Sequence, residues 1–233
     1  MTALRTLLAS GPLGLLALLP ALLLTWAPGT ARAQVPEFAV VFHVATTAAG
    51  VPVVDDDTLR TKLAEAGVLF APAGVAFYID EVRSLPPEHE VIDDIRERRH
   101  LRRYLVPRAI NIFVTQAIHD PRPSAATVRA AAAQGREPTG WISGAHIPSG
   151  GRQRPATYIL LSARTGLWSL PHELGHFFGA NHHPDPDNVM SYGFGRRVFD
   201  ERQLALFRRR AASYVRRRDV RSRDTSVHAV PEG

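Results

Sequence analysis

Apolar residues fall into short runs separated by amphipathic stretches, a pattern typical of a mixed α/β domain. Four runs have the length and the β-branched or aromatic content of buried strands, namely residues 38–44, 74–82, 109–114 and 156–161. Leu59, Leu63 and Leu69 follow acidic residues that can cap a helix, so we expect an amphipathic helix over residues 57–70. Strands and helices alternate along the chain, which favours a single α/β fold.

The remaining segments carry weaker signals. Residues 88–105 place scattered apolar residues among dense charges and are expected to form a surface helix or an ordered loop. An Ala-rich piece from Ala125 to Ala133 is expected to be an exposed loop or a short helix. Ser169 is a candidate cap for a helix that starts near residues 169–171, and Asp200 can cap a final helix that continues through Tyr214.

One stretch carries the candidate chemistry. His172 and His176 are four residues apart, so on a helix their imidazoles lie on one face and can converge on one metal ion. Glu173 lies beside the first histidine, placed to reach a water molecule on that metal, and we interpret it as the general base. Gly179 can take a left-handed conformation that ends the helix and turns the chain back toward the metal.

This turn would deliver His182 as a third nitrogen ligand. Three neutral imidazoles and an open fourth position are typical of a catalytic zinc site. Histidines at helical spacing can also be ordinary core or surface residues, but five fixed positions together favour the metal site. His183 is the alternative third ligand; neighbouring side chains point apart, and the spacing favours His182.

The pattern His-Glu-x-x-His-x-x-Gly-x-x-His over residues 172–182, with Met190 downstream, resembles the metzincin clan of zinc metallopeptidases. The resemblance implies a twisted mixed sheet, an active-site helix, a Met-turn and a C-terminal helix. It also implies zinc bound by the three histidines, Glu173 as base and acid, and Met190 as an apolar floor under the metal. Tyr192 matches a tyrosine that lies near the metal in astacin-like and serralysin-like members; its alternative is a core position.

The resemblance further assigns residues 141–148 to the edge strand of the sheet. In that clan the edge strand pairs antiparallel with extended substrate, which would place Ser143, Gly144, Ala145 and His146 against a peptide. An ordinary edge strand that binds nothing is the alternative. His146 is interpreted as structural and not as a ligand.

The N-terminus has the features of an export signal. Arg5, a Leu-rich run from Leu13 to Leu24 and Ala31-Arg32-Ala33 match the three parts of a cleavable signal peptide. An uncleaved membrane anchor is the alternative. The absence of cysteine excludes disulfides, a thiol nucleophile and thiolate zinc ligands. We expect a secreted or periplasmic protein with no stable membrane span after cleavage.

The formal net charge of +6 comes mainly from the C-terminus. Residues 208–233 hold eight arginines and three acidic residues. Such a terminus can bind nucleic acid or an anionic surface, but it lacks aromatic interleaving beyond Tyr214, so no specific nucleic-acid partner is expected. A solvated helix end followed by a frayed tail is the interpretation we adopt.

These observations predict a signal peptide over residues 1–33, a metzincin-like catalytic domain over 34–218 and a basic, disordered tail over 219–233. The expected activity is that of a monomeric zinc metalloendopeptidase with one catalytic zinc, acting on protein or peptide substrates. A zinc-binding, non-proteolytic interaction protein is the main alternative, and the intact Glu173 argues against it.

Overall fold

The computed structural model describes residues 35–120, 132, 142–148, 155, 157–193 and 195–225. The predicted signal peptide, all of the Ala-rich piece except residue 132, and Trp141 of the predicted edge strand lie outside these ranges. The described residues all belong to one compact unit. Within the described ranges, no helix has the length and apolar character needed to cross a bilayer.

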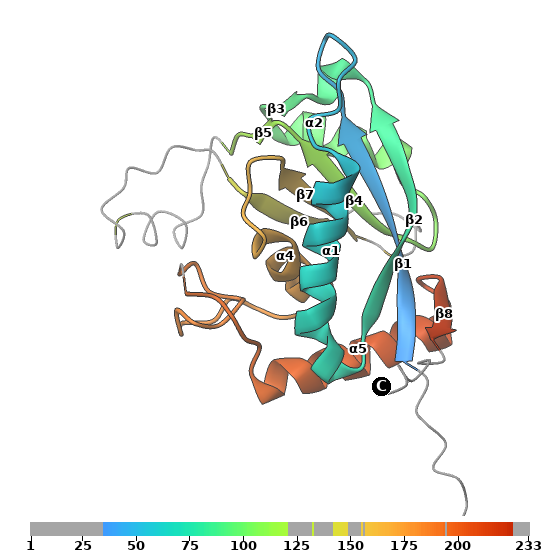
Figure 1. Cartoon of the computed structure of the whole chain (residues 1–233), viewed down its shortest axis with the longest axis vertical. Helices are drawn as coiled ribbons and strands as arrows, with labels where there is room; N and C mark the ends of the chain where they lie inside the picture. Colours follow the sequence, from blue (N-terminus) through green and yellow to red (C-terminus); the bar gives the residue numbers. More distant parts are fainter. Residues whose placement is uncertain are drawn as a thin grey trace, which may run out of the picture. The chain divides into compact units, whose positions relative to one another are not determined.

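A mixed sheet is the centre of this unit (Figure 1). Its strand order is β2-β1-β4-β7-β6, and all neighbours are parallel except β6 and β7. The strands are β1 (Val35–Ala45), β2 (Ala76–Leu85), β4 (Ile110–Thr115), β6 (Gly144–Pro148) and β7 (Thr157–Ser162). The four apolar runs predicted as strands therefore fall on β1, β2, β4 and β7, and the α/β fold class is confirmed.

A second, two-stranded sheet lies beside the main one. It pairs β3 (Val91–Ile92) with β5 (Ala117–Ile118) in parallel. The charged segment 88–105 consists of short elements and not of one helix: the 3-10 turn η2 (Pro87–His89), β3, the helix α2 (Ile95–His100) and the 3-10 turn η3 (Leu101–Tyr104). Asp94 caps α2 by accepting hydrogen bonds from the backbone N–H groups of Arg96 and Glu97.

Three longer helices complete the unit, namely α1 (Asp56–Phe70), α4 (Ser169–Phe177) and α5 (Glu201–Arg217). The 3-10 turn η1 (Ala71–Ala73) follows α1 directly. Asp55 caps α1 by accepting a 2.7 Å hydrogen bond from the backbone of Thr58. Asp200 and Gln203 form a reciprocal capping box at the start of α5. Ser169 does not cap α4: the cap position belongs to Trp168, which makes no side-chain capping bond, and Ser169 is the first helical residue.

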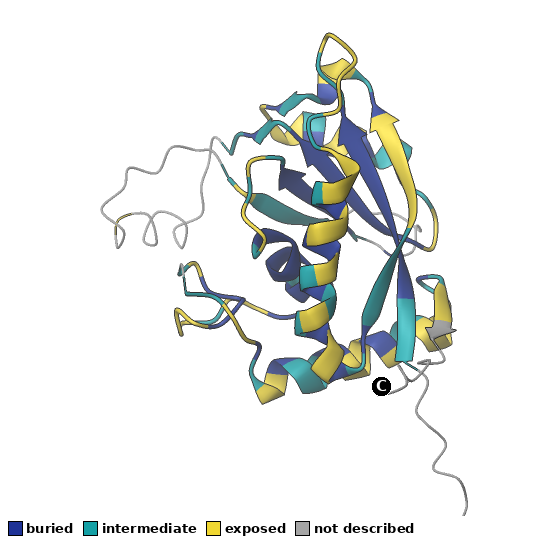
Figure 2. Cartoon of the chain, in the orientation of Figure 1, coloured by how far each residue is buried: buried dark blue, intermediate teal, exposed yellow. Residues whose placement is uncertain are grey.

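The main core lies between the sheet and these helices, where Phe70 of α1 packs against Phe178 and against Phe207 of α5. A smaller apolar cluster that includes Phe113 and Tyr158 covers the other face of the sheet. Burial on both faces explains why the central strands are continuous apolar runs. Figure 2 shows the middle of the sheet and α4 as buried, while the outer side of α1 is exposed.

The C-terminal segment is ordered further than the sequence predicts. Strand β8 (Ser222–Thr225) pairs antiparallel with the start of β1, and Val220 is buried in the main core. Arg221 forms an ion pair with Asp80, and Arg223 with Glu37. The expectation of a disordered tail from residue 219 is therefore wrong as far as residue 225, because two of the arginines have acidic partners on β1 and β2. Residues 226–233 lie outside the described ranges.

Candidate metal centre

Helix α4 presents two histidines on one face, as the four-residue spacing predicts. The ring centroids of His172 and His176 are 4.8 Å apart. The Nδ1 atom of His172 lies 2.8 Å from the backbone oxygen of Val189, and that of His176 lies 2.8 Å from the oxygen of Ala180. A carbonyl oxygen can only accept, so each Nδ1 donates and each Nε2 is left with its lone pair available.

The chain reverses after α4 and returns His182 to the same place. Gly179 adopts a φ of 93°, a conformation that disfavours side chains with a Cβ, and the backbone N–H of Ala180 donates to the oxygen of Gly175 over 2.9 Å. The Nε2 atom of His182 then lies 3.1 Å from that of His176. One nitrogen from each of the three histidines lies within 4.8 Å of the others.

This donor set fits a zinc ion. Two nitrogens bound to a tetrahedral zinc at their usual bond length are about 3.3 Å apart, close to the separation of His176 and His182. The pKa of His172 is lowered to about 3 and that of His182 to about 4, in both cases mainly by burial, which also lowers the pKa of His176. All three imidazoles are therefore neutral at neutral pH, as metal ligation requires. The facing Nε2 lone pairs of His176 and His182 repel each other unless a cation lies between them.

Glu173 is buried beside this group, with 6% of its surface exposed. Burial raises the pKa of its carboxyl to about 8, and the positive charge of Arg196 acts in the opposite direction. A cation held by the histidines would act in the same direction as Arg196 and favour the ionised form. A buried carboxyl group with a shifted pKa next to three convergent imidazoles has the surroundings expected of a general base.

The edge strand makes room for this carboxyl at Gly144. A Cβ atom at that position would lie 3.0 Å from both Cγ and Oε1 of Glu173, and 3.0 Å from Cδ2 of Leu161. The absence of a side chain at Gly144 therefore permits the close approach of β6 to α4. Sequence analysis proposed Gly144 only as part of the substrate strand and missed this contact, because nothing local connects residues 29 positions apart.

Met190 lies under α4, in line with the floor position that the resemblance implies. It is fully buried, and its side chain packs against Gly175, where a Cβ atom would collide with its sulfur. The Asn188 side chain accepts a 2.8 Å hydrogen bond from the backbone of Met190 and donates a 2.9 Å bond to Gln203. Gln203, the partner of the cap residue Asp200 at the start of α5, thus also fixes the turn under the metal site, and the capping-box spacing was the available signal for it.

Tyr192 and His183 take different positions around His182. The Tyr192 hydroxyl lies 3.2 Å from Nδ1 of His182, on the side of the ring away from the atom that faces His176. His183 points elsewhere: its Nε2 lies 3.5 Å from a carboxylate oxygen of Asp200, and its Nδ1 accepts from the backbone of Asp185. The structure thus brings His182, and not His183, to the other two histidines; a catalytic role of Tyr192 stays a prediction.

Strand β6 is the terminal strand of the sheet within the described ranges. The backbone oxygen of Ser143 accepts a 2.9 Å hydrogen bond from Ser162, so bonding to β7 falls on alternate residues from Ser143. In an antiparallel pair the residues between them, Gly144 and His146, direct their N–H and C=O groups outward. The His146 ring lies 6.3 Å from that of His176, and burial lowers its pKa to about 4. It is not part of the three-histidine group.

Arg196 was not identified from the sequence. Its Nε atom is buried and has no hydrogen-bond partner among the described residues. Its charge acts on both Glu173 and His172, lowering the pKa of each. It lies in an arginine pair just after the Met-turn that carries no distinguishing pattern, so only the folded structure reveals its proximity to the site.

No family model matches the chain, and a search of curated proteins finds no match. Solved structures do match. Archaemetzincin from Methanopyrus kandleri aligns with a TM-score of 0.50 at 17% identity, over 76% of this chain and 96% of that one. Metalloproteinase-II from Bacteroides fragilis aligns with a TM-score of 0.49 at 10% identity, over 77% of this chain and 55% of that one. A zinc-dependent peptidase from Methanocorpusculum labreanum aligns with a TM-score of 0.41 at 13% identity, over 72% of this chain and 99% of that one.

The likeness to archaemetzincin shows that this chain has the metzincin-like fold. His172, His176 and His182 fit the long histidine motif of that fold, and in the structure they form one group that can hold a metal ion. The prediction of a metzincin-like zinc peptidase fold is therefore confirmed, whereas the individual catalytic roles remain predictions.

Proposed function

We propose that the protein is an exported zinc-dependent metalloendopeptidase in which Glu173 acts as general base and general acid. The observation that carries the proposal is the convergence of three neutral imidazoles beside a buried carboxyl group. That carboxyl lies directly against a terminal strand of the sheet. Together these groups form a metal site, a base and a surface for an extended peptide within a few ångströms.

In this proposal His172, His176 and His182 hold the metal through nitrogen atoms that are already deprotonated. When bound, zinc lowers the pKa of a water molecule to about 7 and polarises the carbonyl group of the bond to be cleaved. The backbone oxygens of Val189 and Ala180 fix the tautomers and the ring orientations of the first two ligands. Met190 packs directly against Gly175 of α4 and keeps the helix in place.

Glu173 moves the proton. Its carboxylate accepts a proton from the attacking water and afterwards passes it to the nitrogen of the leaving amine. Burial favours the protonated form of Glu173, and the charge of Arg196 favours the ionised form, so the two effects bring the carboxyl toward a pKa useful near neutral pH. We propose that the Tyr192 hydroxyl donates a hydrogen bond to the developing oxyanion.

The proposed substrate is a protein or peptide in an extended conformation. The outward N–H and C=O groups of Gly144 and His146 support this proposal, because they are spaced to continue the sheet by one strand. Pairing at Gly144 would place the peptide backbone next to Glu173. We further propose that residues 1–33 direct export, and that the chain acts as a monomer.

The proposal can be tested by digestion of a peptide library with the purified protein, alongside a measurement of zinc content. We expect about one zinc per chain, cleavage within peptides, loss of cleavage on chelation and recovery when zinc is restored. Cleavage that persists after verified removal of zinc would contradict the proposal. A zinc-loaded protein that cleaves no peptide would instead favour the non-proteolytic alternative.

A further inference from the structure

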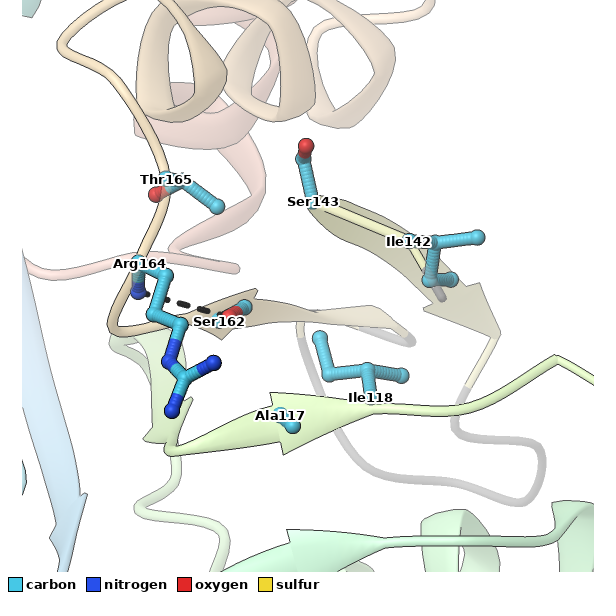
Figure 3. Close-up of a pocket in the computed structure, with 7 residues that line it drawn as sticks. All are labelled: Ala117, Ile118, Ile142, Ser143, Ser162, Arg164 and Thr165. Carbon is cyan, nitrogen blue, oxygen red and sulfur yellow. Dashed lines mark hydrogen bonds between the residues drawn. The ribbon is translucent and has the colours of Figure 1, made fainter. Parts of the chain in front are cut away.

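A pocket of about 220 Å³ lies where β7 ends and the chain turns toward α4 (Figure 3). It is separate from the three-histidine group but lies along the same edge strand. The lining residues come from β5, from the segment entering β6, from the end of β7 and from the loop after it. They are Ala117, Ile118, Ile142, Ser143, Ser162, Arg164 and Thr165. We call it the Arg164 pocket.

The pocket combines an apolar wall with a cationic rim. Ile118 and Ile142 supply the wall, while Ser143 and Arg164 are exposed. Figure 3 shows the Arg164 side chain extending from the loop toward β5. The Gln116 amide faces the guanidinium of Arg164, and the amide orientation that satisfies both groups has its oxygen accept from Nε and from one terminal nitrogen over 3.2 Å. This orientation positions the guanidinium at the rim of the pocket.

No carboxylate in the described part of the chain forms an ion pair with Arg164. This differs from Arg83, Arg221 and Arg223, which have acidic partners. A guanidinium that is held in place by a neutral amide keeps its positive charge uncompensated, and its planar fork matches a carboxylate. The expected ligand group is therefore a carboxylate.

The position of the pocket relates it to the proposed reaction. Ser143, which lines it, is the neighbour of Gly144, and Gly144 touches Glu173. Residues along a strand are about 3.3 Å apart, so the pocket begins about one residue from the catalytic carboxyl. Ser143 and Ile142 precede β6, whose direction is from Gly144 to Pro148.

The direction of β6 indicates which side of the substrate reaches the pocket. Antiparallel pairing is the more stable arrangement for a strand added to a sheet edge. The backbone N–H of Ile142 donates a 3.0 Å hydrogen bond to the oxygen of Ile118, so pairing with a substrate strand ends near Gly144. In the antiparallel arrangement the substrate residues that pass Ser143 and the pocket follow the residue opposite Gly144. They therefore belong to the C-terminal product, on the leaving-amine side of the cleaved bond.

We propose that the Arg164 pocket binds a substrate carboxylate on the C-terminal side of the cleaved bond, within about three residues of it. The inference rests on the proposed peptidase function. The pocket is smaller than the roughly 300 Å³ or more typical of small-molecule sites, so it accommodates one side chain or one chain end. The carboxylate belongs either to an Asp or Glu side chain or to the free C-terminus of a short peptide.

The test uses internally quenched peptides of one sequence in which Glu, Gln or Lys occupies each of the three positions after the cleaved bond. We expect kcat/KM to be about three- to tenfold higher for Glu than for Gln at one of these positions, the range of one charge-assisted contact at a partly solvated site. Arg164→Ala removes the preference and Arg164→Glu shifts it to Lys. Arg209→Glu, an exposed arginine on α5, is the matched charge control and should leave the preference unchanged.

Two further arms separate the sources of the carboxylate and keep the test independent of turnover. Peptides that end two or three residues after the cleaved bond are compared as free acids and as amides, and an advantage of the acid identifies the chain end. Fluorescence anisotropy then measures Kd for the same peptides on Glu173→Gln, with and without Arg164→Ala. We expect Kd for the acidic peptide to rise about three- to tenfold when Arg164 is removed.

The outcomes distinguish this inference from the function on which it rests. A protein that cleaves all peptides equally, with equal effects of Arg164→Glu and Arg209→Glu, would overturn the pocket assignment and leave the peptidase intact. A preference located before the cleaved bond would overturn the side assigned here. A protein that cleaves nothing but binds acidic peptides through Arg164 would support the pocket and contradict the peptidase.

Discussion

Gly144→Ala is a sharp perturbation of the proposed site because it changes neither a ligand nor the base. The added Cβ would lie 3.0 Å from Cγ and Oε1 of Glu173 and from Cδ2 of Leu161. Carbon atoms in favourable contact are about 3.5 to 4.0 Å apart, so one of these side chains must retreat by about 0.5 Å or more. Leu161 is fixed in the core, and the carboxyl of Glu173 is therefore the group that we expect to move.

The magnitude follows from this displacement. Overpacking a tight site costs about 1 to 3 kcal/mol of folding free energy. A shift of about 1 Å in a reacting group can cost about a hundredfold in rate, so a shift near half of that predicts a loss of roughly tenfold in kcat/KM. Zinc content should stay at the wild-type level, because the three atoms nearest to the new methyl group belong to Glu173 and Leu161 and not to a histidine.

The assay compares kcat/KM on a quenched peptide, zinc content and melting temperature for wild type, Gly144→Ala and Gly67→Ala. Gly67 is the matched control: it lies within α1, and a Cβ there meets nothing within 4 Å. Gly67→Ala should stabilise the protein by about 0.5 to 1 kcal/mol and leave kcat/KM unchanged. A Gly144→Ala protein with unaltered kcat/KM would refute the placement of Glu173 as the base.

Three further predictions concern residues around the site and the end of the chain. His182→Ala should lose zinc more severely than His183→Ala, as measured by zinc content after dialysis; the reverse order would identify the neighbour as the ligand. Tyr192→Phe should lower kcat roughly ten- to a thousandfold with zinc content unchanged. An unaltered kcat together with weaker zinc retention would contradict the catalytic role and show that the hydroxyl only orients His182. Truncation after residue 218 should lower the melting temperature by about 5 to 10 °C, because Val220 leaves the core. Truncation after residue 225 should leave the melting temperature unchanged. Equal melting temperatures for the two truncated proteins would refute the role of β8.

The local features of this chain were predictable because each has a short-range physical cause. Apolar runs mark the strands, since both faces of the central sheet are covered. Asp55 and Asp200 begin helices because their side chains accept from backbone N–H groups three residues later. The histidine motif could be interpreted because helical spacing and a glycine turn determine where three rings converge.

Features that depend on distant segments were not predictable. The Arg-rich terminus has the composition of a solvated tail, yet Arg221 and Arg223 find acidic partners more than 140 positions away. The contact between Gly144 and Glu173 and the approach of Arg196 to the same carboxyl likewise arise only from the packing of separate elements. Ser169 shows the limit of a local rule, because a plausible capping residue begins the helix without capping it.

The central claim is that Glu173 acts as the base beside a metal that it does not bind. Glu173→Gln preserves the shape of the side chain and removes the group that accepts the proton, so its zinc content and its rate of peptide cleavage should be measured side by side with wild type. The account predicts zinc near one per chain and cleavage reduced by orders of magnitude. Cleavage at the wild-type rate, or loss of zinc together with activity, would contradict it.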